Sequence, residues 1–204
     1  MMEIILRFHP LINKCRSCLM QNRGLFVVVA LSLLFVISSA SNSHAQIYEI
    51  TFSQSDIALS SDDYGDIVNI PGCHLKGEPG NPFLPVRTGH IAAPAGYEIT
   101  GISAVNEVWM EIDGKFDIRP APTPVPLSYE GPLPDVIRNQ AVYGSSNAYP
   151  EQTMEFTGAG SMRGFSIGGF KINPLRYHPE SGRVEMLERV SLQVDYAPGQ
   201  SRFE

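Results

Sequence analysis

Cysteine is scarce in this 204-residue chain, which contains three. Cys15 and Cys18 form a C-x-x-C pair, but they lie in an N-terminal segment that we expect to be removed, which leaves Cys73. One cysteine cannot form an internal disulfide. We therefore expect an apolar core alone to hold residues 46–204 together, since a domain of about 150 residues buries roughly 70% of its unfolded surface.

Motifs of catalysis and metal binding are also lacking. The chain has no G-x-S-x-G, no P-loop and no G-x-G-x-x-G before a helix. Cys73 and His74 are adjacent, so in an extended segment their side chains point to opposite faces and cannot act as a nucleophile–base pair. His90 and His178 stand alone, and residues 62–66 lack the downstream glutamate of a calcium loop. The sequence predicts no enzyme activity, no metal site and no cofactor.

The first 45 residues have the organisation of a signal peptide. Basic side chains precede an apolar stretch at residues 25–37, and Ser43-His44-Ala45 gives the small-x-small pattern of a cleavage site. The stretch is shorter than the 20 or so residues that span a bilayer, so we expect no retained membrane anchor. Cleavage after Ala45 would leave Gln46 as the new N-terminus.

The charge of the remaining domain is acidic. Residues 1–45 carry four basic side chains and one acid, so the net charge of −6 becomes −9 for residues 46–204. Such a domain repels nucleic acid and anionic lipid, and neither is an expected partner.

Short strands dominate the expected secondary structure. Apolar and polar residues alternate over residues 190–196, and residues 97–112 are rich in strand formers, enough for one bent strand or two. Turn signals predict hairpins at Asp113-Gly114, leading into residues 115–119, and at residues 179–182. The 16 prolines and 18 glycines leave few windows for a helix. The prediction is an all-β single domain, an antiparallel β-sandwich or open barrel, behind the signal peptide.

The order of several motifs resembles the N-terminal propeptides of gingipain-type cysteine peptidases, over residues 46–197. These motifs are the 77–86 segment (G-x-P-G-x-P-x-L-P-V), 91–94 (IAAP), the proline run 120–126, Tyr143-Gly144, Tyr149-Pro150, 162–165 (MRGF), 172–179 (INPLRYHP) and the closing strands 184–187 and 190–196. The resemblance implies an antiparallel β-sandwich that assists folding of a peptidase domain and blocks its active-site cleft until cleavage. It also implies a secreted or bacterial cell-envelope location, in the periplasm or on the outer surface.

In this family a propeptide loop lies in the cleft, and in arginine-specific members a basic side chain can occupy the primary pocket. We expect the long, turn-rich segment 128–152 to be this loop, free of contacts with the core. Its candidate residues are Arg138, Tyr143 and Tyr149. Arg163 is the competitor, but residues 162–165 are expected to lie in a strand, a poorer place for an insert.

The sequence is compatible with several kinds of chain and with a second function. The chain stops at Glu204 without the catalytic domain of such precursors. A truncated precursor, a fragment and a free-standing inhibitor are all compatible with this. The peptidase partner would accordingly be bound in cis or in trans. The function of a different class is a cell-surface β-sandwich module for adhesion or carbohydrate binding. Trp109 is the only tryptophan available for sugar stacking, and its place in a long strand favours a structural role.

We predict that the exported protein begins at Gln46, because the cleavage site follows Ala45 directly. N-terminal sequencing of protein from the cell envelope or the medium measures this. A mature protein that starts at Met1, or an intact chain embedded in the membrane, would contradict it.

Overall fold

The computed structural model describes residues 44–199, which contain ten β-strands, a 3-10 turn and one helical turn. The predicted signal peptide lies outside these residues except for its last two positions. No helix in the described range is long and apolar enough to cross a bilayer. The elements are β1 (His44–Thr51), η1 (Gln54–Asp56), β2 (Ala58–Asp62), β3 (Gly65–Asn69), β4 (His74–Lys76), β5 (Leu84–Ala92), β6 (Tyr97–Ile112), α2 (Gln140–Tyr143), β7 (Met154–Met162), β8 (Phe165–Ile172), β9 (Leu175–His178) and β10 (Arg183–Pro198).

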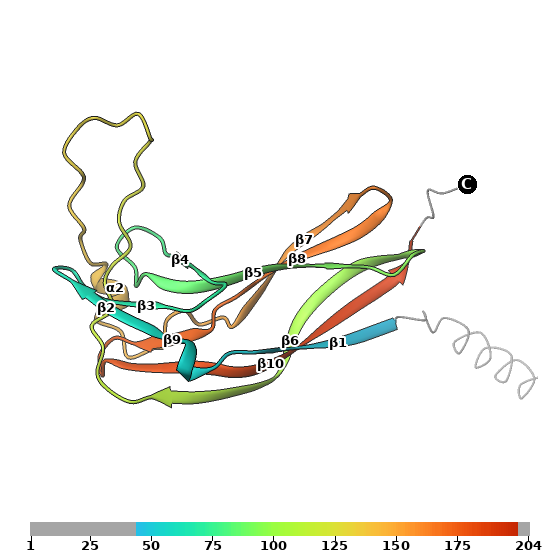
Figure 1. Cartoon of the computed structure of the whole chain (residues 1–204), viewed down its shortest axis with the longest axis horizontal. Coiled ribbons are helices and arrows are strands. Elements are labelled where there is room, and N and C mark those ends of the chain that lie inside the picture. Colours follow the sequence, from blue (N-terminus) through green and yellow to red (C-terminus); the bar gives the residue numbers. More distant parts are fainter. Residues whose placement is uncertain (1–43, 200–204) are drawn as a thin grey trace, which may run out of the picture. The chain divides into compact units, whose positions relative to one another are not determined.

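Antiparallel pairing builds two main sheets and a separate hairpin (Figure 1). The first sheet has the order β1-β10-β6, and β9 also pairs with β10. The second has the order β4-β5-β8-β7, and β2 and β3 form the hairpin. The prediction of an all-β antiparallel sandwich is therefore confirmed.

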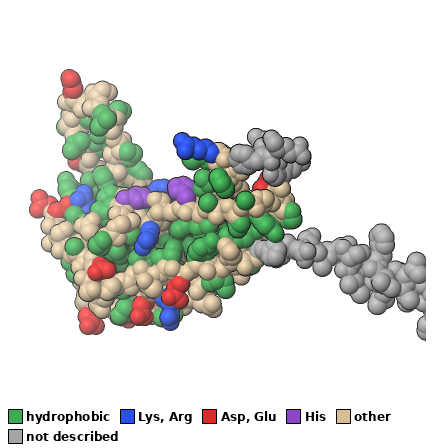
Figure 2. Space-filling view, turned by 45° about the vertical axis from the view of Figure 1, so that its right-hand side comes forward, with side chains coloured by type: hydrophobic (Ala, Val, Ile, Leu, Met, Phe, Trp, Pro, Cys, Tyr) green, Lys and Arg blue, Asp and Glu red, His purple; other side chains and the backbone are tan. Residues whose placement is uncertain are grey.

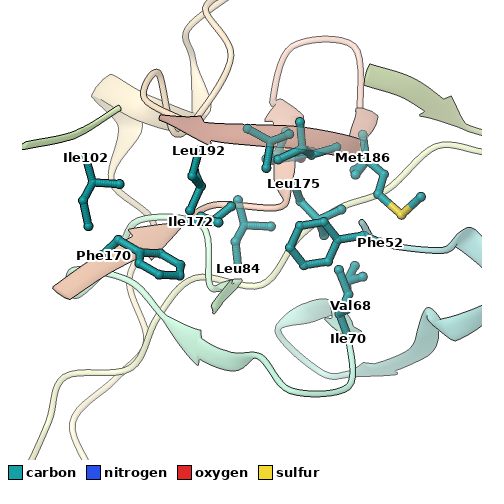
Figure 3. Close-up of a cluster of buried hydrophobic side chains, with 14 of the residues drawn as sticks. Phe52, Val68, Ile70, Leu84, Ile102, Phe170, Ile172, Leu175, Met186 and Leu192 are labelled. Carbon is teal, nitrogen blue, oxygen red and sulfur yellow. The ribbon is translucent and has the colours of Figure 1, made fainter. Parts of the chain in front are cut away.

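The core is filled from both sheets. Leu192 of β10 and Ile102 of β6 meet Phe170 and Ile172 of β8, and Leu84 of β5 completes this region (Figure 3). All five side chains are buried. Each buried side chain of this size contributes about 1.5–3 kcal/mol relative to its exposed state, so the two sheets are held together mainly by apolar burial.

The alternation of apolar and polar residues over 190–196 corresponds to the buried and outer faces of β10. Val190, Leu192, Val194 and Tyr196 are all buried, as the period of two predicts. The intervening positions are less buried, apart from Ser191. Strands with one apolar face therefore fix which side of this sheet faces the core.

Two local predictions are confirmed around β10. The turn at residues 179–182 joins β9 to β10, with His178 opposite Arg183. Residues 97–112 form the single strand β6, which pairs with β10 along most of its length. Its register shifts near Arg189, and Asn106 has a positive φ of 53°, so the strand bends there.

The hairpin predicted at Asp113-Gly114 is wrong. Residues 115–119 do not fold back on β6 but pair with the β2–β3 hairpin. The Asp66 N–H donates to the Asp117 carbonyl oxygen at 2.7 Å, and the Arg119 N–H donates to the Asp66 carbonyl oxygen at 3.0 Å. A third bond runs from the Asp117 N–H to the Asp66 carboxylate at 2.7 Å. Asp66 thus satisfies backbone groups of Asp117 and Arg119, and β6 does not.

Candidate functional site

The longest irregular segment of residues 44–199 projects away from the sheets at the end where the β2–β3 hairpin lies (Figure 1). It spans residues 122–137, and we call it the projecting loop. Five prolines interrupt it, and proline has no N–H with which to join a β-ladder. Its composition therefore explains why it forms neither strand nor helix.

Both ends of the projecting loop are fixed to one turn, at Gly80 and Asn81. The Gly80 N–H donates to the Ala121 carbonyl oxygen, and the Asn139 N–H donates to the Gly80 carbonyl oxygen, both at 2.9 Å. Asn81 is buried and accepts two bonds of 2.8 Å, one from the Ala121 N–H and one from the Asn139 side-chain amide. Gly80 has a φ of +84°, and a Cβ there would lie 2.7 Å from the Ile137 carbonyl oxygen. Glycine is thus required at this base.

Arg138, the first candidate for insertion, lies at the foot of the projecting loop. Its guanidinium donates to the Asp117 carboxylate at 2.8 Å and to the Tyr64 carbonyl oxygen at 3.1 Å. It also lies 5.0 Å from the centre of the Tyr143 ring. The hydrogen bond to Asp117 raises the pKa of Arg138 above its ordinary value. The residue is therefore engaged within the domain, where it ties the loop to residues 64 and 117.

Tyr143 and Tyr149 are half-buried rather than exposed. The Tyr143 hydroxyl donates to the Ile118 carbonyl oxygen at 2.8 Å, and its ring meets Tyr177 edge-on at 6.4 Å. Tyr149 exchanges two backbone hydrogen bonds of 2.8 Å with Tyr177. Burial raises the pKa of both phenols. The expectation that residues 128–152 are free of core contacts is therefore wrong for the second half of that segment.

Arg163 does not lie in a strand, which corrects the reason for ranking it below Arg138. It is the first of two residues that connect β7 to β8, between the paired Met162 and Phe165. Arg163 has a φ of 50° and Gly164 a φ of 82°, as a tight two-residue hairpin turn requires. The side chain is exposed, and none of the other residues of the described range pairs with its guanidinium. This turn presents a basic side chain to solvent.

Trp109 has the structural role that its position in a strand favours. Its indole N–H donates to the Glu107 carboxylate at 2.9 Å, and the Arg176 guanidinium covers one ring face at 3.9 Å from the centre. The ring also packs against the buried core. Its best face for stacking a sugar is therefore occupied by the protein itself.

Cys73 is half-buried and packs against the core. Burial raises the pKa of its thiol, so the thiol stays protonated at neutral pH. Because the thiolate is the nucleophilic form of cysteine, this environment suits a packing role.

We predict that Arg138→Ala loosens the projecting loop while the sheets stay intact. Its ion pair with Asp117 is exposed, so the change should cost less than about 1 kcal/mol of global stability. Limited digestion with chymotrypsin should nevertheless cut the loop at Leu127 or Tyr129 several-fold faster than in the wild type. Arg163→Ala is the control and should leave this rate unchanged. Equal cutting of Arg138→Ala and wild type would contradict the role of Arg138 as a tether.

Comparison with known proteins agrees with the fold and with the order of motifs. The family Propeptide_C25 matches residues 36–204. Lys-gingipain and Lys-gingipain W83 from Porphyromonas gingivalis are each 21% identical over 166 residues, which is 78% of this chain but only 10% of the relative's length. The chain thus spans a small part of these relatives.

Two solved structures share the fold. A structure of gingipain K from P. gingivalis, concerned with its zymogenic latency, has a TM-score of 0.59 at 18% identity and covers 79% of this chain and 95% of its own. A complex of the pro- and mature domains of RgpB from P. gingivalis has the same TM-score at 15% identity, covering 78% and 85%. The family match confirms the prediction of a propeptide domain rather than a catalytic one. This chain belongs to the Propeptide_C25 family, the propeptides of gingipain-type cysteine peptidases.

Proposed function

We propose that this chain is the exported propeptide of a gingipain-type cysteine endopeptidase, which assists folding of the peptidase domain and blocks its active-site cleft until it is cleaved off. The family match over residues 36–204 carries the proposal. Its partner is the peptidase domain, bound in cis or in trans. The protein acts in the periplasm, at the cell surface or in the medium, and the organisation of residues 1–45 supports this location.

Within this proposal, Arg163 is the side chain that enters the primary pocket of an arginine-specific peptidase. Two features of the β7–β8 turn support this assignment. The guanidinium of Arg163 has no internal partner to give up among residues 44–199, and it is presented at the tip of a hairpin. In such a pocket it would meet a carboxylate through two parallel hydrogen bonds.

The turn also explains how an inserted arginine escapes hydrolysis. A peptidase attacks a peptide bond that lies extended along its cleft, with the carbonyl carbon aligned to the nucleophile. Arg163 and Gly164 both have positive φ, so the 163–164 bond is curled within the hairpin. Straightening it would break the pairing of Met162 with Phe165. Arg163 can therefore bind without presenting a bond in the geometry for attack.

Arg138 remains the alternative insert, at a greater cost. To enter a pocket it would have to leave the Asp117 carboxylate, the Tyr64 carbonyl oxygen and the Tyr143 ring. These contacts are partly exposed and are worth up to about 1 kcal/mol, which is subtracted from any gain in the pocket. The adhesion or carbohydrate-binding alternative gains no support from Trp109, whose ring is covered by Arg176.

The test measures inhibition constants of purified wild type and variants against the mature peptidases gingipain K and RgpB. Arg163→Ala should weaken inhibition about thirtyfold, because an anchor of this kind contributes 2 kcal/mol or more. Arg163→Lys tests the specificity of the pocket: the variant should inhibit a lysine-specific peptidase better than the wild type does, and an arginine-specific peptidase less well.

Arg189→Ala, at an exposed position of β10, serves as the control and should change the constant by less than about threefold. Equal constants for wild type and Arg163→Ala would remove Arg163 from the mechanism. A loss confined to Arg138→Ala would move the insert there, and failure of the wild type to inhibit either peptidase would count against the function as a whole.

A further inference from the structure

Large apolar side chains are exposed unevenly over the described surface. Ten of them are exposed among residues 44–199, and six of these belong to two projections, the projecting loop and the β7–β8 turn. Figure 2 shows hydrophobic atoms along the projecting loop. The six are Leu127, Tyr129, Leu133, Ile137, Met162 and Phe165.

The projecting loop leaves most of the surface of its large aliphatic side chains exposed. The Leu127 side chain is fully exposed, and Leu133 and Ile137 retain 77% and 75% of their accessible surface. Glu130 and Asp135 are the only charged residues from 122 to 137. Large apolar side chains that gather on one exposed segment, rather than being scattered singly, point to a site of protein interaction.

The loop presents this surface from a fixed base. Its two ends are hydrogen-bonded to Gly80 and Asn81, and Arg138 adds the ion pair with Asp117. Its five prolines restrict the backbone between these ends. On binding a partner, the loop therefore loses less conformational entropy than a flexible linker would.

The two projections stand on the same side of the domain. In Figure 1 the projecting loop and the tip of the β7–β8 hairpin both rise above β4 and β5, and Figure 2 keeps this arrangement in a turned view. The strands between them expose polar side chains, among them His74 and Lys76 of β4 and Thr88 and His90 of β5. One globular partner that lies over these strands can contact both projections.

We propose that the projecting loop is a second, apolar docking surface for the same peptidase domain whose cleft takes Arg163. The inference rests on the proposed function and extends it to a separate contact. A stable interface takes about 20–30 residues a side, whereas the turn from Met162 to Phe165 supplies four. The loop supplies apolar surface that a cleft insert alone lacks. Leu127, Leu133 and Ile137 bury against an apolar patch on the body of the peptidase.

The chemistry of the two contacts differs in its dependence on salt. Arg163 binds through charge, so its contribution falls as ionic strength rises. The loop contact is apolar and is retained in concentrated salt. Arg163 thus blocks the cleft, and the apolar side chains of the projecting loop bind the body of the peptidase.

The test uses the purified chain with mature RgpB and gingipain K whose catalytic cysteines have been blocked, and it measures Kd at low and high salt. The variant combines Leu127→Ser, Leu133→Ser and Ile137→Ser, and it should raise Kd at least tenfold at both salt concentrations. Ile47→Ser is the matched control, since Ile47 is 65% exposed on β1, and it should leave Kd unchanged. Thermal unfolding confirms that all variants fold.

An unchanged Kd for the triple variant, with tight binding of the wild type, would overturn this inference and leave the proposed function standing. If neither peptidase binds the wild type, the proposed function fails and the loop contact fails with it. Size-exclusion chromatography tests whether a second copy of this chain binds the loop instead of the peptidase. A wild-type dimer that the triple variant converts to a monomer would assign the loop to a second copy of this chain and overturn the inference.

Discussion

β10 holds the first sheet together, because β1, β6 and β9 all bond to it. Its side chains Val190, Leu192 and Val194 are completely buried, so the same strand joins its own sheet and packs against the second one. Phe170 and Ile172 of β8, in the other sheet, belong to the same buried cluster. A polar residue at any of these positions would destabilise the packing of the two sheets, because burying an unpaired polar group costs free energy.

Polar and apolar contacts are divided between the base and the outer part of the projecting loop. At the base, the Asn139 side-chain amide donates to Asn81, and Arg138 donates to the Asp117 carboxylate and the Tyr64 carbonyl oxygen. Beyond the base, the loop exposes Leu127 completely and Leu133 and Ile137 over most of their surface. Hydrogen bonds thus set the position of the loop, and its apolar side chains remain available for a partner.

The sequence predicted what depends on local patterns and missed what depends on distant pairing. The alternation in β10 and the turn at residues 179–182 are local signals, and both predictions are confirmed. Residues 115–119 pair with the distant β2–β3 hairpin instead of β6, and Tyr143 is held by Ile118; neither contact leaves a periodic trace. Arg163-Gly164 was missed because arginine rarely takes positive φ, although the glycine between two apolar runs was a usable signal.

The central claim is that both projections bind the peptidase, and hydroxyl-radical footprinting tests it most directly. The chain is compared alone and bound to mature RgpB or gingipain K with a blocked catalytic cysteine. Footprinting reports the exposure of individual side chains. We expect protection of Leu127, Leu133, Met162 and Phe165 in the complex, with no change at Ile47 of β1. Protection confined to the first sheet, or none on either projection, would contradict it.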